Sequence, residues 1–380
     1  MMTTLLRDGP IDPAVVTEVA RRCLDRPSAE VTTWSIEPVA FVPVSITTTG
    51  VDRIHGEAAD GGKTLTWSAF IKSVHSIRLW PMFEIVVPDF MQAQVAAQPW
   101  RTEAELYTSS LPAVLPDGFR MPRAYQVEDV GPERIRLWLE DLDEAFPAWD
   151  DARYARAARL LGRLGGRCAL DRVPADLRGV TAPHLSLVTE GPLAHLTLPA
   201  LAMDTTWANP LIARAVDPAL RHDLAVLAKR VPAWVERLDR LPRVFAHGDA
   251  CPQNLLATRD DPDGFVAIDW GGFAGYGPVG ADLAQLLAGR AHTGELRTGD
   301  LPRVHAAIAA AYTDGLRAEG LDIDPAEVAA GATGTLLLRT GFTALPLELL
   351  SREPTEELAA LFRSRAGLAR FIADLALAAG

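Results

Sequence analysis

The chain has 380 residues, of which 48% are hydrophobic and 23% charged, a composition typical of a soluble globular protein long enough for two domains. Its formal net charge of −12 argues against nucleic acid as a partner, because phosphate backbones are bound by concentrated Lys and Arg, and it is compatible with a neutral or cationic ligand. The three cysteines, Cys23, Cys168 and Cys251, are too widely spaced to predict a disulfide framework or a zinc site.

No stretch reaches the ~18 consecutive apolar residues that a membrane span requires. The N-terminus carries Asp8 early and lacks the apolar core of a signal peptide. We therefore expect a cytoplasmic protein that does not associate with membranes. Nothing in the sequence predicts its oligomeric state.

The first third of the chain is rich in predicted strands. Residues 12–26 predict an amphipathic helix with Asp12 as N-cap, and β-prone runs then occupy residues 31–80. Lys72 ends an alternating segment of these strands. It is one of only three Lys in the chain, against 34 Arg, which suggests that a compact ammonium group is needed at this position. The alternative is a strand-edge Lys that opposes aggregation.

A short helix and two more strands follow. Residues 100–107 have helical composition and offer Glu103 and Glu105, which lie two residues apart and so face different sides of a helix. Residues 134–142 form an alternating strand that ends in the acids Glu140 and Asp141.

The rest of the chain is mainly helical. The predicted helices span residues 150–170, 206–240, 280–290, 302–320, 325–349 and 354–378. A β-rich part followed by a helical part predicts an α+β fold with two lobes, which we place at residues 1–141 and 142–380.

Two acidic motifs interrupt the helices. The stretch His247-Gly248-Asp249-Ala250-Cys251-Pro252-Gln253-Asn254 follows a short buried strand, and Ile268-Asp269-Trp270 follows another. Phosphoryl transfer needs this set of groups: a carboxylate that takes the proton of the attacking hydroxyl, and an amide and a second carboxylate that hold Mg²⁺. The five-residue interval from Asp249 to Asn254 matches the catalytic loop of kinases.

Three other interpretations of these motifs compete with this one. An Asp after Gly often forms a turn. A metal-dependent hydrolase would use His247, Asp249 and Asp269 as ligands, but it would need further ligands at matching strand ends. Cys251 suggests a nucleophilic-cysteine enzyme, yet the sequence places no evident activator beside it, so we assign it no catalytic role.

The motifs resemble those of the aminoglycoside phosphotransferase and choline kinase family, small-molecule enzymes with a protein-kinase-like fold. The resemblance implies a small β-rich N-lobe and a larger, mainly helical C-lobe. It implies Asp249 as catalytic base, Asn254 and Asp269 as metal ligands, and His247 as a support of the loop. Asp282, in a matching Asp-Leu-Ala segment, would hold the catalytic loop through backbone hydrogen bonds.

The same resemblance assigns roles upstream. Lys72 would bind the α- and β-phosphates of the nucleotide with Glu103 as its partner, because Glu103 stands four residues before Tyr107 as in the family's pattern. Main-chain groups of Glu140 to Leu142 would bind the adenine edge. The phosphate-binding turn is assigned only to residues 45–56, which lack a Gly-rich motif, so a plain hairpin is equally expected there.

These observations predict an ATP-dependent (or GTP-dependent) kinase that uses Mg²⁺ and phosphorylates a hydroxyl of a small polar molecule. The acceptor would be an antibiotic (aminoglycoside, nucleoside or macrolide), an amino sugar or an amino alcohol, neutral or cationic. The alternative is a nucleotide-binding pseudokinase with a regulatory role. Intact Asp249, Asn254, Asp269 and Lys72 argue against it.

Overall fold

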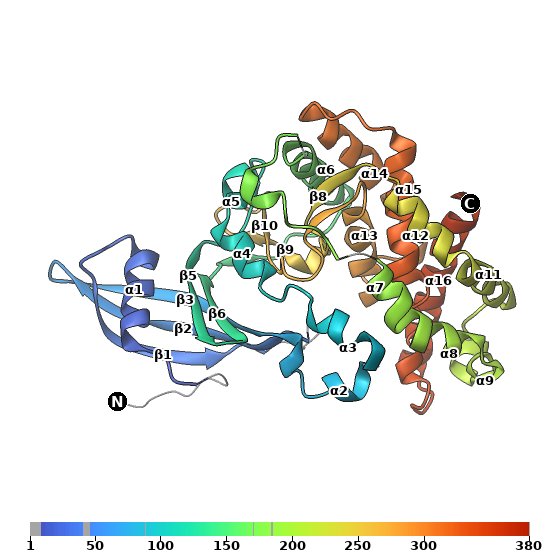
Figure 1. Cartoon of the computed structure of the whole chain (residues 1–380), viewed down its shortest axis with the longest axis horizontal. Coiled ribbons are helices and arrows are strands. Elements are labelled where there is room, and N and C mark those ends of the chain that lie inside the picture. Colours follow the sequence, from blue (N-terminus) through green and yellow to red (C-terminus); the bar gives the residue numbers. More distant parts are fainter. Residues whose placement is uncertain (1–8, 41–45, 88, 170, 184, 380) are drawn as a thin grey trace. The chain divides into compact units, whose positions relative to one another are not determined.

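The computed structural model describes residues 9–40, 46–87, 89–169, 171–183 and 185–379. Contacts divide the chain into two compact units (Figure 1). The first comprises the described residues of Met1–Pro112 and Met121–Ala145, and the second those of Ala113–Arg120 and Phe146–Gly380. The sequence-based boundary after Asp141 stays a prediction about functional lobes.

The first unit is built on an antiparallel sheet of five strands in the order β1-β2-β3-β6-β5. Its strands are β1 (Glu30–Pro38), β2 (Thr48–Asp60), β3 (Lys63–His75), β5 (Ala124–Gly131) and β6 (Arg134–Glu140), with the short β7 (Glu144–Ala145) after them. Its helices are α1 (Pro13–Leu24), α2 (Phe83–Val86), α3 (Asp89–Ala96) and α4 (Thr102–Thr108), and α5 (Leu111–Val114) lies where the chain passes into the second unit.

Helix α1 covers part of this sheet and closes the core of the first unit. Asp12 accepts a hydrogen bond from the Ala14 N–H at 2.8 Å and Pro13 occupies the first turn, as the sequence predicts. Val16 and Val19 of α1 are fully buried against a cluster that includes Ile54 and Trp138 of the sheet. The alternation of polar and apolar residues along β3 therefore buries one face of the strand under α1.

The second unit is mainly helical. Its strands are β4 (Phe119–Arg120), β8 (Arg243–Ala246), β9 (Leu255–Thr258), β10 (Phe265–Ala267) and β11 (Gly275–Pro278). Its helices are α6 (Asp151–Arg167), α7 (Ser186–Val188), α8 (Leu198–Ala202), α9 (Asp204–Ala208), α10 (Pro210–Ala213), α11 (Pro218–Lys229), α12 (Val231–Asp239), α13 (Asp282–Thr293), α14 (Leu301–Ala318), α15 (Pro325–Leu336) and α16 (Glu356–Ala379). A π-helical turn, Leu337–Gly341, directly follows α15.

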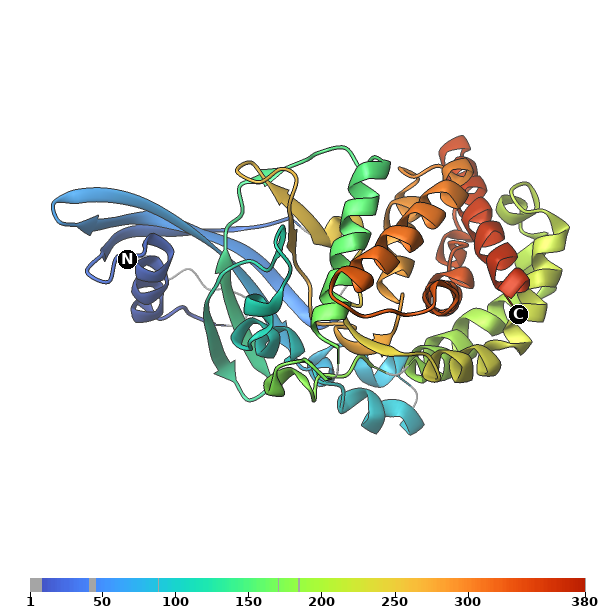
Figure 2. The same cartoon turned by 90° about the horizontal axis from the view of Figure 1, so that it is seen from above.

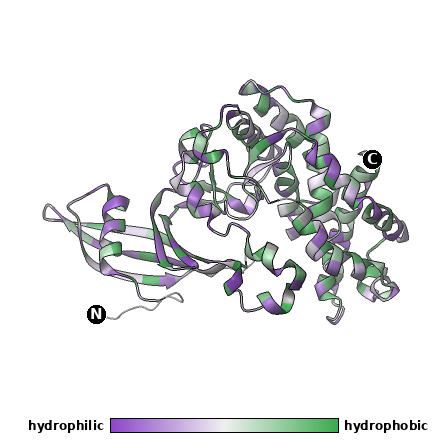
Figure 3. Cartoon of the chain, in the orientation of Figure 1, coloured by the Kyte–Doolittle hydropathy of each residue, from purple (hydrophilic) through white to green (hydrophobic). Residues whose placement is uncertain are grey.

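Helices α6 and α14 lie side by side in both views (Figure 1, Figure 2). They approach so closely that a Cβ at Gly162 would stand 2.1 Å from the Tyr312 carbonyl oxygen, so only glycine fits there. The helices of this unit carry both hydrophilic and hydrophobic residues along their length (Figure 3). The buried residues of α6 include Leu161 and Leu164. Helix α6 also contacts β8, the strand that leads into the first acidic motif.

The predicted helix 206–240 is wrong as a single element. The chain forms α9, α10, α11 and α12 there, and α10, α11 and α12 each begin with a proline at one of their first two positions. Proline lacks the N–H that a continuous helix would need, so each one starts a new helix. The predicted helix 325–349 ends earlier, since the π-helical turn closes at Gly341. No helix among the described residues has the length and apolar character to cross a bilayer.

Candidate functional site

Strand β8 leads directly into the loop that carries Asp249. It pairs antiparallel with β11, and three of its four residues are buried, which holds its end in place. The next residue, His247, is fully buried, whereas Asp249 is partly exposed. The apolar strand thus ends by presenting a carboxylate at the surface of the second unit.

Gly248 makes the turn between them. Its φ is +79°, and a Cβ at this position would stand 2.0 Å from the carbonyl oxygen of Phe273. Both the left-handed backbone and the close approach require glycine.

The loop backbone is held from α13 by Asp282. Its two carboxylate oxygens accept hydrogen bonds from the N–H groups of His247, at 3.1 Å, and Gly248, at 2.7 Å. Burial raises the pKa of Asp282, while these two donors act in the opposite direction. Asp282 therefore contacts the loop in the way that the resemblance implies.

His247 connects the two acidic motifs. Its Nδ1 accepts from the Asp249 N–H at 3.2 Å, so its Nε2 carries the proton and donates to the Ile268 carbonyl oxygen at 2.9 Å. Its ring lies 4.4 Å from that of the buried Trp270. Burial lowers the pKa of His247, which keeps the ring neutral. These contacts fit a support of the loop and give no acid–base role.

Asn254 and Asp269 are brought together through Ile268. The Ile268 N–H donates to the Asn254 carbonyl oxygen at 3.0 Å, and Asp269 is the next residue along the chain. Asp269 is exposed and has a φ of +60°, the left-handed region, which Asp tolerates better than most residues. Unfavourable backbone conformations of this kind are concentrated at functional sites, which is consistent with a functional role for Asp269.

These two residues fit Mg²⁺. The Asn254 amide nitrogen donates to Asp249, at 2.9 Å to its carbonyl and 3.2 Å to its carboxylate, so the amide Oδ1 is the atom left for a metal. The part of the chain that the structure describes holds no cluster of three or more His, Cys, Asp or Glu suited to a metal. Mg²⁺ does not need one, because it is bound by one or two protein oxygens together with phosphates and water.

Two side chains that the sequence analysis missed contact the Asp249 carboxylate. Gln285 of α13 donates to Oδ1 at 3.0 Å, and Arg339 of the π-helical turn donates to the same oxygen at 3.2 Å and to the Gly248 carbonyl. The Arg339 guanidinium lies 4.0 Å from the centre of the Phe273 ring. Burial lowers its pKa and Asp249 acts in the opposite direction. Gln285 could have been identified from the sequence, because it stands three residues after Asp282 and therefore lies on the same face of the helix.

Cys251 has the properties of a packed side chain. Burial raises the pKa of its thiol to about 12. A thiol of this acidity is a poor nucleophile at neutral pH, which agrees with giving Cys251 no catalytic role.

The first unit contains the second group of predicted residues. Lys72 Nζ donates to Glu103 Oε2 at 2.7 Å, and the two side chains are 11% and 7% exposed. Strand β3 is the middle strand of its sheet, so Lys72 is not an edge residue. Glu105 is exposed, and α4 turns Glu103 inward. The structure thus pairs the two residues that the sequence analysis selected.

The predicted adenine-binding segment follows β6. The N–H of Glu140 donates to the Arg123 carbonyl oxygen at 2.8 Å, and the Glu140 carboxylate accepts from the Arg123 N–H at 3.0 Å, so the Glu140 N–H already has an acceptor just before β5. Leu142 lies outside regular structure. Of the predicted phosphate-binding turn, Ser45 lies outside the described residues. The Thr49 hydroxyl donates to the Ser73 carbonyl oxygen at 3.3 Å.

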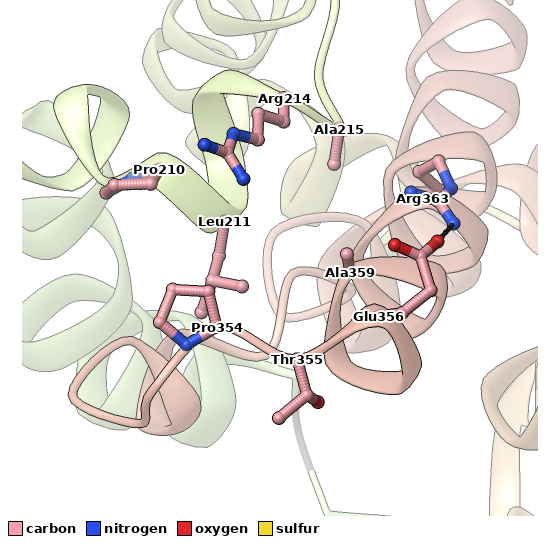
Figure 4. A pocket seen from close by; sticks show the side chains of 9 residues that line it. All are labelled: Pro210, Leu211, Arg214, Ala215, Pro354, Thr355, Glu356, Ala359 and Arg363. Atoms are coloured by element: carbon pink, nitrogen blue, oxygen red, sulfur yellow. Dashed lines mark hydrogen bonds and ion pairs between the residues drawn. The ribbon is translucent and has the colours of Figure 1, made fainter.

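A small pocket of about 150 Å³ lies between α10 and the start of α16 (Figure 4). Glu356 and Arg363 form an ion pair of 2.8 Å on one side of it, and Leu211 lines another. None of its lining residues belongs to the acidic motifs, and we assign it no role.

Comparisons with known proteins identify the family and the fold. The model of the Phosphotransferase enzyme family matches residues 116–321, more than half of the chain. A search of curated proteins gives no match. Among solved structures, the chain is similar to a microcompartment-associated aminopropanol kinase, with 16% identity over 95% of this chain and 98% of that one and a TM-score of 0.51. It is also similar to a choline kinase from Cryptosporidium parvum, with 11% identity over 96% and 95% and a TM-score of 0.50.

At such identities these likenesses concern the fold, which is the kinase-like α+β fold that the sequence predicts. The matched region contains the catalytic-loop motif, Asp269 and Asp282. The chain therefore belongs to the Phosphotransferase enzyme family and has the fold of small-molecule kinases.

Proposed function

We propose that this chain transfers the γ-phosphoryl group of ATP to a hydroxyl of a small polar molecule, with Asp249 as the base. The observation that carries the proposal is the arrangement of Asp249, Asn254 and Asp269. His247 and Asp282 connect the backbone segments that carry these groups through hydrogen bonds. In the transfer, the hydroxyl oxygen bonds to phosphorus, its proton passes to the Asp249 carboxylate, and the bond from phosphorus to the nucleoside diphosphate breaks.

Lys72 and Glu103 supply the nucleotide-binding part of this proposal. An ammonium group held by a buried carboxylate at 2.7 Å is a fixed positive charge, which suits the α- and β-phosphates. Main-chain groups of Leu142, and the main-chain carbonyl of Glu140, would bind the adenine ring of the nucleotide. We propose ATP as the donor, with GTP as the alternative, and a cytoplasmic location for the enzyme.

Asn254 and Asp269 would hold Mg²⁺. When bound, the ion neutralises charge on the phosphate oxygens. Asp269 contributes a full charge and Asn254 a neutral oxygen, so Asp269 should dominate the affinity for the metal.

For the acceptor we propose an amino alcohol, an amino sugar or an aminoglycoside-like antibiotic. The structural neighbours include kinases named for aminopropanol and choline, and the net charge of −12 favours neutral or cationic acceptors over acidic ones. A role in antibiotic resistance is one form of this proposal.

The first experiment is a search for the acceptor. Thermal shift with Mg-ATP and Mg-GTP selects the donor. ADP release is then followed with 1-amino-2-propanol, choline, streptomycin, amino sugars and, as an unrelated acceptor, mixed proteins. We expect turnover with at least one small hydroxyl compound. Binding of Mg-ATP without turnover of any acceptor would favour the pseudokinase, and ADP release with the mixed proteins alone would contradict the small-molecule assignment.

The second experiment separates the base from the metal ligands. Asp249→Asn should lower kcat by about 10²–10⁴-fold with nucleotide affinity nearly unchanged. Asp269→Ala should weaken the Mg²⁺-dependent binding of ATP, and Asn254→Ala should weaken it less. Asp263→Asn is the matched control, because Asp263 is an exposed carboxylate shortly before β10. Near-normal turnover of Asp249→Asn would refute its role.

A further inference from the structure

Arg339 is a buried cation that none of the predicted roles uses. Its side chain is 10% exposed and its Nη2 lies 3.2 Å from Asp249 Oδ1. It also donates to the carbonyl oxygen of Gly248, the residue before the base. A single guanidinium thus contacts both the carboxylate of Asp249 and the backbone that carries it.

The two oxygens of the Asp249 carboxylate accept different numbers of hydrogen bonds. An ionised carboxylate has two oxygens with two acceptor positions each. Oδ1 accepts from Gln285 Nε2, at 3.0 Å, and from Arg339 Nη2, so both of its positions are filled. Among the described residues, only Asn254 donates to Oδ2, from Nδ2 at 3.2 Å, which leaves Oδ2 one acceptor position.

Resting on the proposed function, we propose that Arg339 is the positioning residue of the base. Together with Gln285 it fills Oδ1, so that Oδ2 is the oxygen that receives the proton of the acceptor hydroxyl. Without Arg339 only Gln285 and Asn254 hold the carboxylate, each with one hydrogen bond, so the two oxygens become alike in their hydrogen bonding.

The position of Arg339 depends on the fold around it. It projects from the π-helical turn Leu337–Gly341, and such turns occur frequently at functional sites. Its guanidinium stacks on Phe273, whose backbone also contacts Gly248 and which stands four residues after Asp269. The same side chain therefore links the segment after the metal ligand to the loop of the base.

The test is a double-variant cycle with turnover as the readout. The probes are the best acceptor from the screen and, in parallel, water, followed as ADP release from Mg-ATP. Arg339→Met should lower kcat by about 10–10²-fold, the range expected for a misplaced catalytic group, with KM for ATP within about twofold. Arg339→Lys should recover only part of the loss, because one ammonium cannot reproduce the planar fork.

The cycle distinguishes positioning from general support. Because Arg339 acts through Asp249, adding Arg339→Met to Asp249→Asn should cause little further loss of kcat. The control is Arg153→Met, because Arg153 is also buried, donates to the Pro262 carbonyl oxygen at 2.9 Å and lies 4.3 Å from the Phe265 ring. We expect its kcat to stay near wild type. Wild-type kcat in Arg339→Met, or equal losses in both backgrounds, would overturn the inference.

A stability readout keeps the inference testable without turnover. If wild type turns over no acceptor and no ATP, the proposed function fails. The inference about Arg339 is then decided by Tm. Arg339→Met should lower Tm clearly in the wild-type background and by less than half as much with Asp249→Asn, because the charge that Arg339 faces is gone. Equal drops in Tm would refute it, and Arg339→Lys takes the place of the Met variant if that one does not fold.

Discussion

The ion pair between Lys72 and Glu103 allows a quantitative prediction about the first unit. The two charged atoms lie 2.7 Å apart, and their side chains are only 11% and 7% exposed. Solvent screens such a pair weakly, so removing the charge of one partner costs far more here than it does at the surface. Glu103→Gln keeps the size of the side chain and removes only the charge. It should lower the free energy of unfolding by about 3–5 kcal/mol.

The control is a pair in the same unit with an equally short distance. Arg101 and Asp129 lie 2.6 Å apart, but their side chains are 36% and 65% exposed. Asp129→Asn should therefore cost about 1 kcal/mol or less. Urea unfolding followed by circular dichroism, without nucleotide, measures both variants. If Glu103→Gln costs no more than Asp129→Asn, the Lys72–Glu103 pair is not a buried structural charge pair and our reasoning from exposure fails.

Three further predictions concern the second unit. Gly248→Ala should destabilise the fold and abolish turnover, because the new Cβ would stand 2.0 Å from the Phe273 carbonyl oxygen; near-wild-type Tm and kcat would contradict this. Asp282→Ala should lower both kcat and Tm, since two backbone N–H groups lose their acceptor, and kinetics with calorimetry would measure it. Burial and Arg365 lower the pKa of His292 to about 4, whereas an unfolded His titrates near 6.5. The contribution of His292 to the free energy of unfolding, up to about 3 kcal/mol, is present above pH ~6.5 and lost as the pH falls toward 4. His292→Gln should therefore reduce the fall of Tm between these two pH values.

Local signals predicted much of the fold and of the site. The N-cap at Asp12, the alternation along β3 and the apolar strands before each acidic motif all appear in the structure. The scarcity of Lys pointed to Lys72. Helix periodicity allowed only one of Glu103 and Glu105 to reach it, and the family resemblance, through Tyr107 four residues later, selected Glu103; the structure pairs the selected residues. The breaks within 206–240 could also have been predicted, because the prolines that cause them are visible in the sequence.

Arg339 could not be found in this way. Its partner Asp249 stands ninety residues earlier in the chain, and it is one of 34 Arg. What brings it to the carboxylate is the π-helical turn after α15, where one extra residue per turn changes which side chains face inward. That change of register depends on tertiary packing, and neither composition nor periodicity carries it.

The order of the strands in the first unit has a consequence for synthesis on the ribosome. Strand β3 ends at His75, but its second neighbour β6 begins only at Arg134, roughly 60 residues later. At about 5–20 residues per second, the apolar β3 is left with an open edge for several seconds while α2, α3 and α4 emerge. During that interval the nascent chain offers unpaired N–H and C=O groups beside Phe70 and Ile71, which are able to pair with another chain. We therefore expect the yield of folded protein to depend on translation speed and chaperone supply between these two strands, and slowing translation within residues 76–133 should increase aggregation.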